Sequence, residues 1–231
     1  MTYKIRRSAD RKYFDHGWLK TFHTFSFGSY YDPEFMGFRD LRVINEDRVD
    51  PGHGFPPHEH KDMEIISIVL EGELAHEDSM GTKSVIQKGD VQAMNAGEGV
   101  THSEFNPSST EPVHFLQIWI FPNKTGINSR YSQVKLPSIK NEWVRIASKE
   151  DAEDQIKIEQ DVELFSLSLE PGIKVSKELE SDRYGWLQVV EGEIKFNADT
   201  LKAGDAVAID PSSKFIIEAV EPTHLLYFNL K

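Results

Sequence analysis

The sequence predicts an all-β protein made of two tandem β-barrel domains with little helix. Short runs rich in Val, Ile and Phe are separated by Gly, Pro, Asn and Asp, a pattern typical of sandwiches and barrels. The run SIVLEGELA at Ser67–Ala75 returns as LQVVEGEIK at Leu187–Lys195, with Gly72 and Gly192 in register. This recurrence favours two copies of one fold over chance.

The two copies continue in the same order along the chain. A Gly-Asp pair follows the repeated hairpin in both, and each copy closes on a strand-like run, VHFLQIWIF in the first and THLLYFNLK in the second. The stretch between them is polar and carries Pro, Gly and Asn, as linkers do. We therefore expect one domain at residues 1–122, a linker at 123–141 and a second domain at 142–231.

The clearest helical candidate is short. Ser148 followed by Asp151 can begin a helix, so the segment Ser148–Gln155 is expected to be helical. All other periodic segments of the chain have the pattern of strands.

Composition and charge narrow the class of protein. The 231 residues carry 26 basic and 38 acidic side chains, a formal charge of -12, which argues against binding a nucleic-acid backbone. The absence of cysteine excludes disulfides, thiolate nucleophiles and Cys-type metal sites. No apolar signal core and no run of about 20 apolar residues is found. We expect a cytoplasmic monomer that binds neither nucleic acid nor membrane.

Two pairs of polar residues flank apolar strands in the first copy. His58 and His60 precede the strand in PPHEHKDMEIISIVLEGE, and His102 and Glu104 follow the glycine-rich turn in NAGEGVTHSEFN. Side chains at i and i+2 of a strand share a face, so each pair projects to one side. If the two strands meet, three imidazoles and one carboxylate converge.

The second copy lacks these residues. With the repeated glycines in register, at an offset of 120, His58 and His60 align with Glu178 and Glu180. With the Gly-Asp pairs in register, at an offset of 115, His102 and Glu104 align with Ile217 and Ala219. A side chain required by the fold itself should persist in both copies. The histidines of the first copy therefore indicate chemistry.

Three imidazoles and one carboxylate suit a borderline divalent transition metal. Four protein ligands on a six-coordinate ion leave two positions for substrate or O₂. With zinc, the same four ligands can instead form a closed structural site.

These motifs resemble the cupin superfamily, and the pirin family in particular. The spacing His58-x-His60-x-x-x-Glu64 followed by Gly72 is similar to the first cupin motif, and Gly99-x-x-His102 is similar to part of the second. Flanking segments similar to pirin signatures are HTFSFGSYYDP, LRVINEDRVDPGHGF, HEDSMG and NAGEGVTHSEFNPS.

The resemblance implies a bicupin whose N-terminal barrel alone holds a metal, with His58, His60, His102 and Glu104 as ligands. Many ordinary cupins use the glutamate of the first motif, here Glu64, which could face inward with His60. Pirin-like proteins use the carboxylate after the third histidine, so the resemblance favours Glu104 and leaves Glu64 as a group that supports a ligand or as an outward-facing residue. His76, beside Glu77 and Asp78 in HEDSMG, is expected to orient a turn. Fe(II) is the expected ion, with Zn, Cu, Ni, Co and Mn as alternatives.

Some pirin-like bicupins resemble quercetin 2,3-dioxygenases, which open a flavonol ring with O₂. The resemblance therefore implies an enzyme that takes a small, flavonol-like aromatic substrate and O₂, with Glu104 as ligand or general base. Two alternatives stay open. One is a non-catalytic pirin-like metalloprotein that binds a protein partner. The other is an enzyme with another O₂-dependent or isomerising reaction, because fold does not determine reaction.

Overall fold

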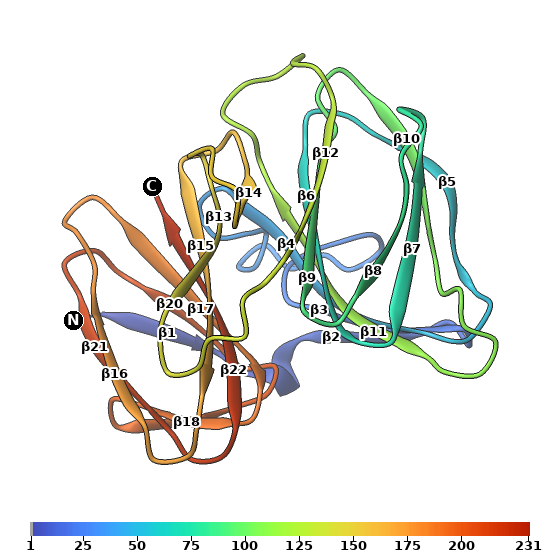
Figure 1. The fold of residues 1–231 in the computed structure, drawn as a ribbon. Coiled ribbons are helices and arrows are strands. Elements are labelled where there is room, and N and C mark those ends of the chain that lie inside the picture. The colour runs from blue at the N-terminus through green and yellow to red at the C-terminus, as the bar shows by residue number, and fades with distance from the viewer. Residues whose placement is uncertain (1) are drawn as a thin grey trace. The chain divides into compact units, whose positions relative to one another are not determined.

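The computed structural model describes residues 2–231, whose regular secondary structure is all β-strand apart from one short 3₁₀ helix, η1 (Ser8–Asp10) (Figure 1). This confirms the all-β prediction. None of the helical structure in these residues has the length and hydropathy that crossing a bilayer requires.

The chain forms two compact units. The N-terminal unit consists of Lys12–Leu136 and Lys149–Gln160. Its strands are β2 (Lys12–Asp15), β3 (Leu19–His23), β4 (Leu41–Val49), β5 (Gly54–His60), β6 (Glu64–Glu71), β7 (Glu73–Asp78), β8 (Lys83–Gln87), β9 (Asp90–Asn95), β10 (Val100–Phe105), β11 (Val113–Ile120), β12 (Arg130–Lys135) and β14 (Ile156–Lys157).

Two antiparallel sheets form the N-terminal unit. The large sheet runs β12-β9-β6-β11-β4-β3-β2 and the small one β5-β10-β7-β8. Strand β6 lies in the middle of the large sheet and is buried from Glu64 to Leu70, which explains its unbroken apolar run. Leu74 and Ile86 of the small sheet pack with Val69 and Phe115 of the large sheet in one core cluster. This cluster joins the two sheets.

The C-terminal unit consists of the residues up to Arg11, Pro137–Ser148 and Asp161–Lys231. Its strands are β1 (Tyr3–Arg6), β13 (Val144–Ser148), β15 (Val162–Leu169), β16 (Lys174–Glu178), β17 (Tyr184–Glu191), β18 (Glu193–Phe196), β19 (Asp199–Lys202), β20 (Ala206–Ile209), β21 (Lys214–Ala219) and β22 (Thr223–Leu230). A large sheet contains β1-β20-β17-β22-β15-β13, and a small one runs β16-β21-β18-β19.

Segments of the chain cross the boundaries expected from sequence. Strand β1, blue in Figure 1, pairs antiparallel with β20 among the orange and red strands. The expected linker at 123–141 contains β12, which pairs with β9 along its whole length. The boundaries at residues 122 and 142 stay a prediction about the sequence repeat. The compact units are each assembled from more than one chain segment.

The prediction of a helix at Ser148–Gln155 is wrong. Ser148 is the last residue of β13, and turns and bends follow it. A helix of eight residues is marginal unless it buries an apolar face. This segment offers only Ala152 as a small apolar residue, and Gln155 closes a local loop by donating to the Glu150 carbonyl oxygen.

The repeated glycines serve the fold itself. Gly72 and Gly192 have φ of 75° and 85°. A Cβ at these positions would lie 2.7 Å from the Pro112 carbonyl oxygen and 2.4 Å from that of Pro222. Only glycine combines positive φ with so close a backbone approach. Both copies therefore keep it.

Strand pairing corrects the alignment of the two copies. Both copies can be counted from the shared glycine turn, through β7, β10 and β5 in the first and through β18, β21 and β16 in the second. His58 and His60 then match Lys177 and Leu179. His102 and Glu104 match Phe215 and Ile217. The sequence-based alignment with Glu178, Glu180, Ile217 and Ala219 was wrong by one or two residues.

Strand β5 also contains a β-bulge, which has no counterpart in the second copy. Between the pairs His102–His58 and Glu104–Phe55, β5 advances by three residues while β10 advances by two, so β5 holds one extra residue. Strand β16 pairs with β21 without such a shift. The misalignment arises between the strands. His60 lies four residues before Glu64, whereas Leu179 lies five before Tyr184; His102 lies eight residues after Met94, whereas Phe215 lies six after Ile209.

Candidate metal centre

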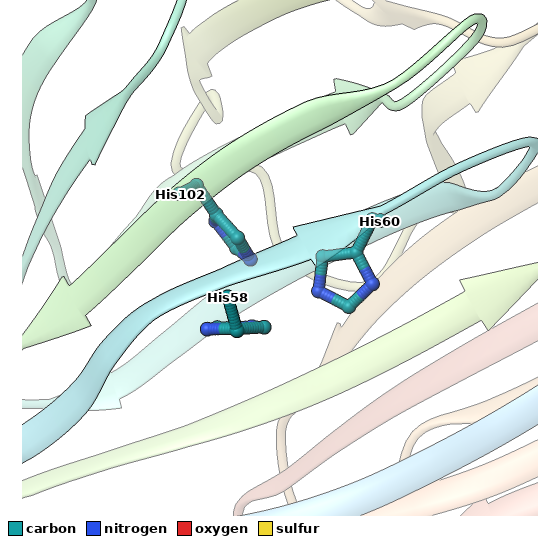
Figure 2. A group of neighbouring side chains, drawn as sticks. All are labelled: His58, His60 and His102. Carbon is teal, nitrogen blue, oxygen red and sulfur yellow. The ribbon is translucent and has the colours of Figure 1, made fainter.

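Three histidines meet at the pairing of β5 with β10. His58 and His60 share one face of β5, and His102 lies directly opposite His58 on β10. The ring centroids are 4.5 Å apart for His58 and His102, 4.8 Å for His58 and His60, and 4.9 Å for His60 and His102. Figure 2 shows the three rings gathered together, two from one strand and one from its neighbour. One nitrogen from each lies within 4.8 Å of the others.

The hydrogen bonds leave ring nitrogens free for a ligand. His58 Nδ1 is 2.9 Å from the Pro56 carbonyl oxygen. A carbonyl only accepts, so Nδ1 carries the proton and the lone pair is on Nε2. His102 Nε2 is buried and has no hydrogen-bond partner among residues 2–231. Buried polar atoms normally have partners, so this nitrogen is a candidate metal ligand.

Burial keeps two of the rings neutral. Desolvation, and then the neighbouring His58, lower the pKa of His60 to about 4. The same causes, with the other histidines, lower the pKa of His102 to about 3. Metals bind the neutral imidazole, so both rings are in the binding form at neutral pH without losing a proton.

Glu104 lies two residues after His102 on β10 and is also buried. Its carboxylate accepts hydrogen bonds from Ser67 Oγ at 3.1 Å and from Gln117 Nε2 at 2.7 Å. It forms a second cluster with His102 and His76, whose ligand atoms also lie within 4.8 Å of one another. Burial raises its pKa to about 7, so the carboxyl changes charge near neutral pH.

His76 is the residue whose role the sequence analysis missed. It lies on β7, is buried, and its Nε2 is 3.0 Å from Asp78 Oδ2. Its Nδ1 is 3.5 Å from His102 Nδ1, a long contact on the side of that ring away from Nε2. Asp78, rather than His76, orients the turn, because Asp78 Oδ1 accepts the backbone N–H groups of Met80 and Thr82. The i, i+2 spacing of His76 and Asp78 was the available signal.

Glu64 has other partners. It is buried on β6, and its two oxygens accept the backbone N–H groups of Glu159 and Gln160, each at 2.8 Å. Burial still raises the pKa of Glu64 to about 7, because these hydrogen bonds only partly offset desolvation. Glu64 ties the segment at 149–160 to β6, and neither candidate metal cluster in the described residues includes it.

Apolar side chains lie beside the three histidines. Trp119 meets the His60 ring edge to face, with centroids 4.9 Å apart. Trp119 also packs with Met63, Ile65, Met94 and Val100 in a small cluster. A surface hollow of about 460 Å³ borders His60 and is lined by Glu59, His60, Lys61, Ser79, Glu98, Gly99, Val100 and Thr101. Of the three histidines, His60 is the one that lines this hollow.

Two antiparallel-sheet units, one with three histidines on facing strands and a glutamate beside them, define a bicupin with one candidate metal centre. The profile of the pirin family matches residues 4–120, and that of the quercetinase C-terminal cupin domain matches residues 145–230. The chain belongs to the pirin family.

Similar proteins cover nearly the whole chain. A quercetin 2,3-dioxygenase of Escherichia coli K12 is 41% identical over 226 residues, which are 98% of this chain and 97% of the relative. A putative quercetin 2,3-dioxygenase of Pasteurella multocida is 41% identical over 216 residues, 92% of each chain. The crystal structure of the E. coli bacterial pirin YhhW in complex with nickel(II) superposes with a TM-score of 0.95 at 40% identity, covering 99% of both chains.

The contact between His76 and His102 predicts a loss of metal affinity in His76→Asn. Groups that hold the distal nitrogen of a ligating histidine typically contribute 10- to 100-fold in affinity, so we expect a fall of about that size. Calorimetric titration with Ni²⁺ measures it. The control is His114→Asn, a buried histidine that pairs with Glu46 at 3.0 Å instead. Equal affinities in the two variants would contradict this role for His76.

The buried carboxyl of Asp47 is expected to make the free energy of unfolding depend on pH. Asp47 is buried on β4, and burial raises its pKa from 3.8 to about 7. The folded state therefore binds this proton more tightly than the unfolded chain, and stability falls as pH rises from about 4 to about 7. The Asp47→Asn variant lacks this dependence. Its free energy of unfolding should rise relative to wild type by up to about 1.4 kcal/mol per pH unit in that window.

Urea unfolding at pH 5 and pH 8 measures this difference. Asp50→Asn, which changes an exposed carboxylate, is the control and should track the wild type at both pH values. A gap between Asp47→Asn and wild type that does not change with pH would rule out a raised pKa for Asp47.

Proposed function

We propose that the chain is a metal-dependent dioxygenase of the quercetin 2,3-dioxygenase type, which opens the ring of a flavonol with O₂. The observation that carries this proposal is the group of three histidines, which offers two free Nε2 atoms, on His58 and His102. The names of the relatives support the reaction class.

We assign His58, His60, His102 and Glu104 as the residues that would hold the ion. Three imidazoles and one carboxylate fit Fe(II), our proposed ion, and equally accept Ni, Co, Mn, Cu or Zn. The nickel complex of the E. coli pirin supports a divalent metal in a protein of this family. When bound, such an ion supplies Lewis acidity that lowers the pKa of a coordinated hydroxyl.

Glu104 is suited to move the substrate proton. When Glu104 is not bound to the ion, its carboxyl, whose pKa burial raises to about 7, can accept a proton from the 3-hydroxyl of a flavonol near neutral pH and release it again. Ser67 and Gln117 each donate a hydrogen bond to this carboxylate, which fixes its position. Glu104 can serve as metal ligand and as base in turn.

The apolar side chains near His60 are suited to a flat aromatic substrate. Trp119 offers an indole face, and Met63 and Val100 extend the same cluster. Substrate pockets are mostly apolar with a few polar groups that fix orientation. A flavonol lying against Trp119 would exclude water from the side of His60.

The experiment compares His58→Ala with His53→Ala. His53 makes the same type of contact as His58, from Nδ1 to a carbonyl oxygen two residues earlier, but lies outside the histidine cluster. Wild type and His53→Ala should bind one metal ion per chain, consume O₂ and bleach the long-wavelength absorbance of quercetin. His58→Ala should lose the metal and at least about 100-fold in turnover.

Each other outcome has a defined meaning. Full turnover after metal removal or in His58→Ala would end the dioxygenase proposal. If His58→Ala loses the metal but the metal-loaded wild type consumes no O₂, the alternative that remains is a non-catalytic pirin-like metalloprotein that binds a protein partner.

A further inference from the structure

The C-terminal unit carries a cation where the N-terminal unit carries its histidines. Lys177 lies opposite Phe215 on β16 and β21, as His58 lies opposite His102 on β5 and β10. The other three ligand positions are filled by the buried apolar residues Leu179, Phe215 and Ile217. One side chain with chemical reactivity therefore remains at this position of the second barrel.

Three aromatic rings surround the Lys177 amine. Its Nζ lies 4.1 Å from the ring centroid of Phe165, 4.9 Å from that of Tyr227 and 5.0 Å from that of Trp143. All three rings come from the large sheet of the unit or the segment that leads into it. A cation within about 6 Å of an aromatic face is attracted by the ring quadrupole. We call Lys177 and these three rings the lysine cage.

The lysine cage has no acidic partner in contact. Among the residues that the structure describes, no carboxylate lies within ion-pair distance of Lys177 Nζ, and Glu163 acts on it only at longer range. Trp143 Nε1 and Tyr227 Oη, which belong to two of the cage rings, are buried without hydrogen-bond partners in the described part of the chain. Unpartnered buried polar atoms are rare and require an explanation, such as a ligand.

Burial changes the reactivity of this amine. Desolvation lowers the pKa of Lys177 from its ordinary value, and Glu163 offsets this in part. A desolvated lysine in an apolar pocket is the usual form of a nucleophilic lysine, because more of the amine is unprotonated at neutral pH.

We propose that the lysine cage is a covalent binding site for small aromatic aldehydes, which Lys177 captures as an imine. The amine nitrogen attacks the carbonyl carbon, the carbinolamine loses water, and a C=N bond replaces the C=O bond. Starting from the ammonium and the aldehyde, the products are the iminium and one water molecule. The step needs no oxidant or reductant.

The product of this step suits the cage better than other lysine adducts do. An iminium keeps a positive charge among the three rings, where the ammonium charge was. A carbamate would instead place a negative charge against the ring faces, and an amide would remove the charge. The partly exposed rings of Trp143 and Phe165 also offer a stacking surface to a planar aromatic aldehyde, whereas Tyr227 is fully buried. These two features select carbonyl compounds as the class of ligand.

Reductive trapping tests the proposal on the intact protein. The whole chain is incubated with benzaldehyde and sodium cyanoborohydride at pH 7, and peptide mass spectrometry compares benzylation of Lys177 with that of Lys174. Lys174 lies on the same strand, is exposed and pairs with Glu218 at 3.2 Å. Because burial lowers the pKa of Lys177, more of its amine is unprotonated at pH 7, so we expect Lys177 to be labelled faster than Lys174.

Two variants complete the test. Lys177→Arg keeps a cation in the cage but cannot form an imine, so it should lose the label and the quenching of tryptophan fluorescence by benzaldehyde. His58→Ala should label at the wild-type rate, because the cage is built without the histidines of the N-terminal unit. Labelling of Lys177 no faster than that of Lys174 would overturn the proposal, whatever the result of the quercetin assay.

Discussion

The register between β5 and β10 is the constraint on which the candidate metal centre depends. Antiparallel pairing sets His58 directly opposite His102. A slip of one residue would turn one strand's side chains to the other face of the sheet and separate the rings. The bulge in β5 lies just beyond this pair. Because of the extra residue, His58 and His60 pair with His102 and Val100 of β10, while Phe55 packs against the core cluster of this unit.

Burial then determines the charge of each group. Imidazoles removed from water stay neutral, as His60 and His102 do, and carboxyls removed from water hold their protons, as Asp47 and Glu104 do. A neutral nitrogen is ready to bind a metal, whereas a carboxyl with a pKa near 7 can exchange a proton. One physical effect, desolvation, thus determines the charge of both the imidazoles and the carboxyls.

Sequence reasoning predicted the fold class, the repeat and the convergence of three histidines, because all three rest on local rules. Strand alternation and i, i+2 spacing can be read along the chain, and the repeat provides two copies of each strand and turn to compare. The loss of the ligands in the second copy was also readable, although the residues that replace them were misaligned by one or two positions, as Lys177 and Phe215 show.

The remaining features depend on tertiary contacts that no local pattern records. The pairing of β1 with β20 joins residues about two hundred positions apart. The contact of His76 with His102 arises across two strands, and Glu64 is engaged by backbone N–H groups nearly a hundred residues away. A bulge shifts register by one residue without any sequence signal strong enough to count it. The different surroundings of Glu64 and Glu104 follow from contacts of this kind.

The most direct measurement is the anomalous diffraction map of a crystal loaded with one divalent metal. The account predicts a single peak in the N-terminal unit, about 2.0–2.2 Å from one ring nitrogen each of His58, His60 and His102 and from a carboxylate oxygen of Glu104. A peak coordinated by Glu64, or no peak among the three histidines, would contradict it.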